Sequence, residues 1–560
     1  MLKKKVMALG IAMSMLAGVL TACGGSSAPA ETPAAEESAP AAEASAPAEE
    51  AAPAVEVTAD VAHAEKRADK IVLSANTDMV NMGPWVSRGT SYNIIGPMIY
   101  ETLGAYDTIG GEFYGILMKD WEQVDDKTFR VTLYDNIYDS DGNQIKAEDV
   151  VYSCETCWAI GELAETAVIE KATALDDYTV EFVWKAAPGV GGFEVVMSNI
   201  YIASKTAYEA HGEMITDPVG TGPYKLKSHV DGSSIVVEAR DDYWQDPELC
   251  KIPNQFANVQ EVEVQIISES SQITMALQTG AIDLNNNVEV EDLPQFRDGG
   301  QYADKFDIYS HPASSGTAIL ANCSPDSPLN DINLRKAVFY AIDADGVRAF
   351  VNGGDNVAFA SFGGVTYSDY DPSWEEINYP YDPELAKEYL SKSAYPNGVT
   401  LKLNLIQGNV WPEEASLAIQ EYLAQVGITL ELNSYPIAQY LPLEGDSTAW
   451  DLGLSGFSNS SNYIVNSWCK YFDKNTIGRD VTKNFVDDPE LQSLMETVMT
   501  IDGHTKENLD AFMNHVFDQA YMKGLFNCNE PIVYNSELIK EIKLDQYGYV
   551  APGAFVYNVD

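Results

Sequence analysis

The sequence predicts a mixed α/β fold on three observations. Residues 399–406, 413–426 and 428–433 have in turn the periodicity of a strand, an amphipathic helix and a strand, which is the pattern of a βαβ unit. Residues 128–133 and 178–184 alternate apolar and polar side chains, as half-exposed strands do. Because two parallel strands need a crossover that covers their sheet, we expect helices packed on the faces of a sheet.

The ends of the elements carry their own signals. The run KIVLSA at 70–75 predicts a buried strand, and WDLGLS at 450–455 predicts another. Glu413 and Glu414 follow Pro412, so the acids meet the positive end of the helix dipole, and Gly427 ends that helix. These local signals fix where the predicted βαβ unit begins and ends.

Charge and composition exclude whole classes of function. The 560 residues contain 34 Lys and Arg against 84 Asp and Glu, a formal charge of −50, so no basic face is available for nucleic acid. With 46% apolar residues the chain has material for large cores, which excludes wholesale disorder. The length predicts about three domains, and seven scattered cysteines are too few for a disulfide-stapled fold.

The first residues predict an export signal. Three lysines at 3–5 precede the apolar run 6–20, which ends in Leu20, Thr21, Ala22 and Cys23. This pattern resembles a bacterial lipoprotein signal, which implies that residues 1–22 are removed and that Cys23 carries the lipid. Two or more acyl chains anchor a protein durably. An ordinary membrane anchor with Cys23 incidental is the alternative, and no later stretch reaches about 18 uninterrupted apolar residues.

The composition of residues 23–66 predicts a disordered tether that begins at the lipidated cysteine. From Gly24 to Glu65 the chain is almost only Ala, Pro, Glu, Ser, Gly and Thr, with nine acids and no Lys or Arg. Such a segment cannot bury enough apolar surface to order itself, and proline and like charges keep it extended. We therefore expect it to hold a globular body away from a membrane surface.

Three loops are the candidate binding site, because ligands of open α/β sheets sit outside the carboxyl ends of strands. They follow the predicted strands at 70–75, 399–406 and 450–455, and the last is rich in small polar residues. A plain surface turn is the alternative for each. The candidate ligand-binding residues are Asn76, Asp78, Met79, Val80, Trp411, Gly456, Phe457, Ser458, Asn459, Ser460 and Tyr463.

A set of separated motifs carries a family resemblance. In order they are DWE at 120–122, KAEDVVYS at 146–153, GTGPY at 220–224, RDDYW at 240–244, ALQTGAIDL at 276–284, LRKAVFYAID at 334–343 and DPELAKEYL at 382–390. Together the chain resembles the extracellular solute-binding proteins of ABC importers, family 5, which include dipeptide- and oligopeptide-binding proteins. Each motif also has a structural explanation; Arg335, for example, is expected to serve packing or an ion pair.

The resemblance implies a two-lobed periplasmic-binding-protein-like fold of type II, with an extra subdomain inserted in the N-terminal lobe. We expect residues 67–88, 200–310 and 529–560 to form lobe I, 89–199 the inserted subdomain, and 311–528 lobe II. A small solute would be trapped between the lobes without any chemistry and handed to permease subunits. The resemblance thus implies a monomeric, lipid-anchored binding protein on the extracytoplasmic face of the cell membrane.

The identity of the ligand stays open at this point. Peptide binders of this family hold an extended ligand through backbone hydrogen bonds and pair its α-ammonium with an aspartate, and here Ser460 stands at that position. A serine does not cancel a charge, so Asp78 or another acid would have to substitute. Peptide uptake is the leading hypothesis, and a sugar, an opine or a chelate is the alternative.

Catalysis is not predicted. Cys154 and Cys157 lie on one predicted helix without the further ligands of a zinc site, and the six histidines show no close pairing, so neither a metal nor a cofactor is expected. An exported glycoside hydrolase with two carboxylates is the rival enzyme hypothesis, because the sequence does not give the distance between two acids. A tethered surface adhesin is a third possibility.

Overall fold

A computed structural model describes residues 63–86, 89–161, 163, 166–361, 364–457, 462–479 and 482–559. The chain divides into two units, Met1–Val55 and Glu56–Asp560, and every described residue belongs to the second. The lipidation candidate Cys23 and the site candidates Ser458, Asn459 and Ser460 lie outside the described residues. Within the described ranges, no helix combines the length and the apolar character that crossing a bilayer requires.

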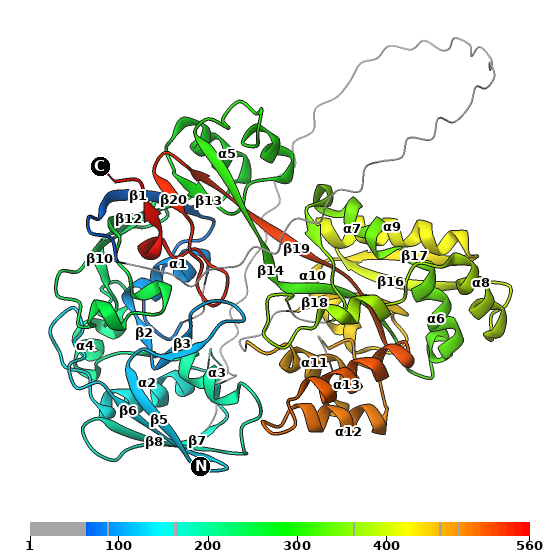
Figure 1. The fold of residues 1–560 in the computed structure, drawn as a ribbon, viewed down its shortest axis with the longest axis horizontal. Helices are drawn as coiled ribbons and strands as arrows, with labels where there is room; N and C mark the ends of the chain where they lie inside the picture. Colours follow the sequence, from blue (N-terminus) through cyan, green and yellow to red (C-terminus); the bar gives the residue numbers. More distant parts are fainter. Residues whose placement is uncertain are drawn as a thin grey trace, which may run out of the picture. The chain divides into compact units, whose positions relative to one another are not determined.

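One mixed sheet continues through the second unit (Figure 1). Its strands in spatial order are β10 (Tyr224–Val230), β11 (Ser234–Ala239), β12 (Val259–Ile266), β1 (Ala68–Ala75), β13 (Leu284–Asn285), β19 (Met522–Asn535), β14 (Phe306–Ala321), β18 (Leu452–Phe457), β16 (Val399–Ile406) and β17 (Ile428–Tyr435), with β15 (Asn356–Val357) paired to β19. β1 is parallel to both β12 and β13, and β16 is parallel to β17.

The predicted βαβ unit is confirmed. β16 and β17 flank α9 (Val410–Gln425), and Gly427 closes the unit with a φ of +86°, a left-handed conformation that favours glycine. The helix begins at Val410, three residues before the predicted start at Glu413. Pro412 is tolerated there because the first turn of a helix has no intrahelical partners for its N–H groups.

Two hydrophobic cores define two lobes. The first core, lobe I, contains β1, β12, the helix α1 (Thr90–Ile99) and the C-terminal residues 532–557; the second, lobe II, contains α9 and the side chains from Ala318 to Phe526. The other helices of lobe II are α6 (Ile332–Ala341), α7 (Ala344–Phe350), α8 (Pro383–Lys392), α10 (Ile437–Tyr440), α11 (Val465–Phe472), α12 (Pro489–Val498) and α13 (Lys506–Asp518). The expected domain boundaries at residues 311 and 528 stay a prediction.

Residues 101–210 add a separate layer to lobe I. A four-stranded antiparallel sheet in the order β5 (Met118–Asp125), β6 (Thr128–Leu133), β8 (Thr179–Trp184), β7 (Ile169–Ala174) packs with α2 (Ala147–Ile160). The remaining short elements there are β2 (Glu101–Thr102), β3 (Gly104–Tyr106), β4 (Phe113–Gly115), α3 (Gly192–Asn199), β9 (Tyr201–Ile202) and α4 (Lys205–Ala210). The alternating burial of β6 and β8 confirms both strands predicted by alternation.

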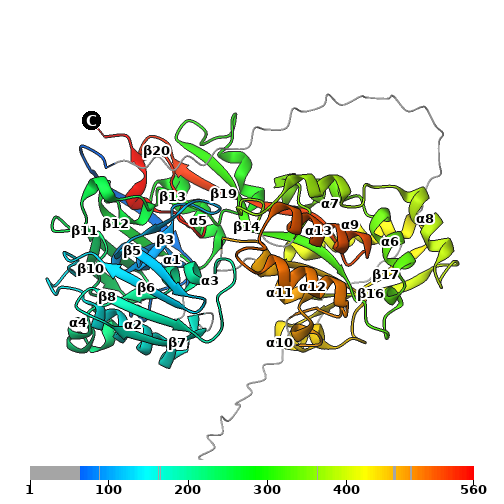
Figure 2. The ribbon, with the colours of Figure 1, turned by 60° about the horizontal axis from the view of Figure 1, so that its bottom comes forward.

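The long strands β14 and β19 connect the two lobes (Figure 2). They pair antiparallel from Phe306 with Asn535 to Leu320 with Met522, so each strand passes from one core into the other. Between the pairs Pro312–Asn529 and Gly316–Asn527 the chain advances four residues on β14 but only two on β19. This bulge bends the pair at the crossing. In lobe I, α5 (Ser270–Thr279), β20 (Ile539–Glu541) and β21 (Val556–Tyr557) complete the fold.

Candidate functional site

A cavity of about 670 Å³ lies beside this crossing, and both lobes contribute to its walls. Lobe I contributes residues that follow its strands, lobe II contributes the start of α9 and the end of β18, and the bulge of β14 with the facing part of β19 forms the wall between them. Seven asparagines are the largest group among the lining residues: Asn76, Asn93, Asn285, Asn286, Asn287, Asn352 and Asn529.

The lobe I wall is built from the carboxyl ends of two neighbouring strands. β1 and β13 are parallel, so Asn76 and Asn285–Asn287 emerge at the same edge of the sheet. The Asn285 amide donates to Ser74 Oγ at 2.7 Å, and Thr90 Oγ1 donates to Asn76 Oδ1 at 2.7 Å. Asn285 Oδ1 also accepts from Asn287 N–H and the residue is buried, so the fold already engages this amide, whereas Asn76 is exposed beside the cavity.

The lobe II wall combines an aromatic ring with open backbone. Trp411 packs edge-on against Phe526, with ring centroids 6.0 Å apart, and Gly456 lies in β18 opposite Thr317. Both residues line the cavity, as do Asn352 and Asp355. A ring flanked by hydrogen-bonding groups suits a small polar ligand with an apolar part.

Two carboxylates line the cavity, Asp355 and Glu530. Asp355 is already engaged, because Arg297 lies 3.3 Å from its Oδ2 and the Asn529 amide donates to its Oδ1 at 2.8 Å. Glu530 lies on β19 with half of its side-chain surface accessible, and burial by the surrounding protein raises the pKa of its carboxyl. No Lys, Arg or His occurs among the described residues that line the cavity.

Three of the predicted site residues, Asn76, Trp411 and Gly456, come together at this cavity. Phe457, which follows Gly456 in the sequence, is the last residue of β18. Tyr463 does not line the cavity; its ring packs edge-on against His504, with centroids 5.2 Å apart. The prediction for Ser458, Asn459 and Ser460 concerns residues outside the described part of the chain and stays a prediction.

The rest of the loop after β1 serves the fold. Asp78 accepts hydrogen bonds from Gly232 N–H at 2.7 Å and from His229 Nε2 at 3.0 Å, so it fixes the turn between β10 and β11. Burial opposes the charge of Asp78, but these hydrogen bonds outweigh it and lower the pKa of the carboxyl. Met79 is buried in the lobe I core and Val80 is exposed, and none of the three lines the cavity.

The lobes also touch away from the crossing strands. Asn462 of lobe II accepts from Gly110 N–H and donates to the Gly111 carbonyl at 3.3 Å. Asn466 donates to the Val190 carbonyl at 3.2 Å, and Val190 N–H donates to the Met499 carbonyl at 3.1 Å. The two lobes therefore contact each other in two regions, at the crossing strands and at the loops around residues 110 and 190.

Comparison with known proteins identifies the family behind this geometry. The sequence model described as bacterial extracellular solute-binding proteins, family 5 Middle, matches residues 112–478, which is more than half of the chain. The chain belongs to this family. It is thus a substrate-binding protein of the ABC-importer type, with the two-lobed fold that the sequence resemblance implied.

Relatives of this family 5 protein agree. It is 25% identical to the probable D,D-dipeptide-binding periplasmic protein DdpA of Escherichia coli (strain K12) over 498 residues, which covers 85% of this chain and 92% of DdpA. The fold is similar to HbpA2 from Haemophilus parasuis, with a TM-score of 0.76, 18% identity and coverage of 88% and 100% of the two chains. DppA from Helicobacter pylori, in complex with peptide STSA, gives a TM-score of 0.65 at 20% identity, covering 88% and 98%.

Several residues of this family 5 protein were not reached by sequence reasoning, above all Asn352, Asp355, Glu530 and the run Asn285–Asn287. The asparagine run had a signal, because it directly follows the motif ALQTGAIDL and begins on the strand β13. Glu530 is the one acidic residue of β19 and stands next to Pro531, which is a weaker signal. Asp355 has no sequence signal that distinguishes it from the other acids.

The remaining sequence candidates have structural roles. Arg335 is buried and donates to the carbonyls of Leu329, Asn330 and Gln519, which confirms packing rather than an ion pair. Cys154 and Cys157 are buried on α2, and burial raises the pKa of the Cys154 thiol. Within the described residues, no cluster of three or more His, Cys, Asp or Glu is arranged to hold a metal ion.

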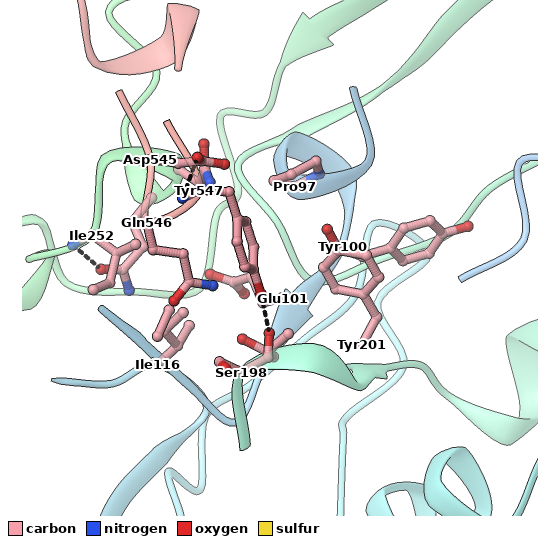
Figure 3. Close-up of a pocket in the computed structure, with 14 residues that line it drawn as sticks. Pro97, Tyr100, Glu101, Ile116, Ser198, Tyr201, Ile252, Asp545, Gln546 and Tyr547 are labelled. Carbon is pink, nitrogen blue, oxygen red and sulfur yellow. Dashed lines mark hydrogen bonds between the residues drawn. The ribbon is translucent and has the colours of Figure 1, made fainter. Parts of the chain in front are cut away.

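A second, smaller cavity of about 40 Å³ lies inside lobe I, next to Glu101 (Figure 3). Gln546 and Tyr547 of the C-terminal segment point toward it beside Glu101 of β2. The Glu101 carboxyl accepts from Tyr243 OH at 2.6 Å and from Trp244 Nε1 at 2.9 Å. Burial raises the pKa of Glu101 to about 7 although both hydrogen bonds oppose the shift.

Proposed function

We propose that this chain captures a di- or oligopeptide between its two lobes and delivers it to the permease subunits of an ABC importer. The observation that carries the proposal is the cavity of about 670 Å³ with walls from both lobes. Its volume falls within the roughly 300–1,000 Å³ of small-ligand sites. The dipeptide named for DdpA and the peptide bound to DppA support this choice of ligand.

The lining suits a peptide backbone. An asparagine amide carries both donors and an acceptor, which complement the C=O and N–H groups of an extended chain, although the fold already uses the amides of Asn285 and Asn529. Apolar residues such as Ile94, Val288 and Trp411 lie among the asparagines and provide room for side chains. A ligand that contacts both walls favours the conformation in which the lobes are together, because binding selects that state.

A polar solute other than a peptide is the second candidate. Seven asparagines would also bind the hydroxyl groups of a sugar or the amide and hydroxyl groups of an opine, and Trp411 offers a face for a ring. A chelate has less support, because neither histidine nor cysteine pairs line the cavity among the described residues. The two candidates differ in the compound that the protein retains.

Mass spectrometry of the purified chain tests this choice. The protein is denatured after native purification, and the small molecules that it releases are identified. We expect peptides of a few residues, and each identified peptide should then raise the melting temperature of the ligand-free protein. Sugars or opines in place of peptides would contradict the peptide assignment. Incubation with peptides and glycosides should give no product, and turnover would contradict a pure binding role.

We also propose that Cys23 is lipidated and anchors the protein to the extracytoplasmic face of the cell membrane. The export signal and the acidic tether of the sequence support this. We expect wild-type protein in the membrane fraction and Cys23→Ser in the soluble fraction, because one substitution removes every acyl chain. Release of wild-type protein by a salt wash would instead indicate a peripheral, unlipidated attachment.

A further inference from the structure

The charged groups of the cavity are all of one sign. Its described lining contains two carboxylates and no cationic side chain, although fourteen of the lining residues have polar or acidic side chains. Arg297 pairs with Asp355 and so accounts for one of these charges. The negative charge of Glu530 is therefore the one that needs a partner.

Glu530 is held at the crossing by backbone pairing rather than by side-chain contacts. It lies opposite His311 in the pairing of β14 with β19, and Pro531 follows it. No hydrogen bond from a described residue reaches its carboxylate oxygens, whose nearest charged-group neighbour is His311 Nε2 at 3.8 Å. Glu530 lines the cavity, and half of its side-chain surface is accessible, so its carboxylate is within reach of a guest there.

His311 does not neutralise this carboxylate. Its Nδ1 lies 3.1 Å from the Pro312 carbonyl oxygen, which only accepts, so Nδ1 carries a hydrogen, and in the neutral ring Nε2 then has a lone pair and offers Glu530 no hydrogen bond. Burial also lowers the pKa of the His311 imidazole, which favours the neutral ring. Among the described residues Glu530 thus has no cationic partner, in a partly desolvated space where burial opposes its charge.

We propose that the cavity selects solutes carrying a cationic nitrogen, either the α-ammonium of a peptide or a basic side chain, and that Glu530 pairs with this nitrogen. The inference rests on the proposed solute capture and adds the charge of the ligand to it. An ammonium or guanidinium that leaves water needs a paired charge, and Glu530 supplies one. The same carboxylate, together with Asp355, disfavours a guest whose anionic group enters this part of the cavity.

Glu530 would then supply the negative charge that Ser460 lacks. A serine hydroxyl accepts a hydrogen bond from an ammonium but leaves its charge uncompensated. The missing aspartate at position 460 and the unpaired carboxylate at position 530 are therefore explained together, since the charge partner of the ligand would come from the crossing strand instead of the loop after β18. Asp78, the other substitute considered from sequence, is occupied by Gly232 and His229.

Isothermal titration calorimetry on the ligand-free chain tests the inference with four probes. All three peptides are C-terminal amides: Ala-norleucine-Ala amide carries the α-ammonium, its N-acetylated form is neutral, and Ala-Lys-Ala amide adds a basic side chain. Agmatine is a cation without a peptide bond. We expect at least one cationic probe to bind about tenfold or more tightly than its neutral analogue. Comparison of the first two probes with the third tells which nitrogen is recognised.

Two variants attribute the preference to Glu530. Glu530→Gln should reduce the ratio between cationic and neutral probes to near one, and Glu530→Asp should restore part of it. Glu431→Gln, on the exposed face of β17, removes the same unit of charge away from the cavity and should leave the ratio unchanged. A ratio that persists in Glu530→Gln would overturn the assignment to this residue.

The outcomes separate this inference from the proposed function. Equal, measurable affinities for charged and neutral peptides would overturn the charge preference and leave peptide capture standing. Binding of agmatine without binding of any peptide would support the charge preference and contradict peptide capture. If no probe bound, both would be contradicted. The wild-type series alone decides the first case, so the test does not depend on how well the variants fold.

Discussion

The protein contains two carboxylates in confined surroundings that differ in what their own chain offers them. Glu101, beside the small cavity of lobe I, is 4% exposed, and both of its oxygens accept hydrogen bonds from neighbouring side chains. Glu530, beside the large cavity, has no such donor among the described residues. Burial raises the pKa of both groups, yet only one of them has its hydrogen-bonding capacity filled within the fold.

This difference shows how to distinguish a structural acid from a binding acid. For both groups the raised pKa reflects burial, which is the removal of water from around the carboxyl. The hydrogen-bond partners show whether the fold has replaced that water, as it has for Glu101, or has left the site to a guest, as for Glu530. The predictions below test this distinction, starting with the largest expected effect.

Truncation of Glu101 should cost the most stability. Glu101→Ala leaves Tyr243 OH and Trp244 Nε1 without their acceptor inside lobe I and enlarges the neighbouring cavity. We expect a loss of about 3 kcal/mol in the free energy of unfolding, measured in urea at pH 5. Glu101→Gln, which keeps the shape and one acceptor, is the matched control. A loss below about 1 kcal/mol would show that these bonds are not structural.

The same carboxyl should make stability depend on pH. Its pKa rises from the ordinary 4.5 to about 7 on folding, so the folded state keeps a proton that the unfolded state has released. The contribution of Glu101 to the free energy of unfolding is therefore fully present below pH 4.5. It is lost as the pH rises from 4.5 to 7, by about 3 kcal/mol. The difference between wild type and Glu101→Gln, measured in urea at several pH values, isolates it. A constant difference would contradict the assignment.

Local patterns were enough to predict most of the framework. The βαβ unit at 399–435 and the alternating strands β6 and β8 follow from periodicities within a few residues, and the order of the motifs implied the two lobes. The start of α9 was missed by three residues because the helix was predicted to begin after Pro412, at Glu413. A proline fits at any position in the first turn of a helix, because the N–H groups there have no intrahelical acceptor. The position of Pro412 therefore does not fix the first residue of the helix.

The binding wall was predicted only in part, for a physical reason. The rule that ligands lie after strand ends correctly pointed to Asn76 and Trp411, which lie within a few residues of a predicted strand. Glu530 reaches the cavity through the pairing of β14 with β19, two segments more than 200 residues apart, and Asp355 lies next to β15, which also pairs with β19. No local pattern encodes that pairing, so the charge of the cavity becomes visible only in three dimensions.

Asp78 shows the opposite case, a predicted binding acid that the fold uses. Because Asp78 holds Gly232 and His229 at the β10–β11 turn, Asp78→Asn should lower stability by about 1.5 kcal/mol without altering the preference for cationic probes. Urea unfolding and calorimetry measure the two effects. Val80→Ala, two residues further along and exposed, should change neither. A reduced preference in Asp78→Asn would place this acid among the ligand contacts after all.

The smallest effect on stability is expected at Glu530, and it is the one on which the distinction depends. Glu530→Gln removes no hydrogen bond that a described residue donates, and it relieves a charge that burial opposes. The free energy of unfolding without ligand should therefore stay within about 0.5 kcal/mol of wild type, like that of Glu431→Gln. A loss comparable to that of Glu101→Ala would mean that Glu530 has a structural partner, because only a carboxylate that stabilises the fold can destabilise it when neutralised.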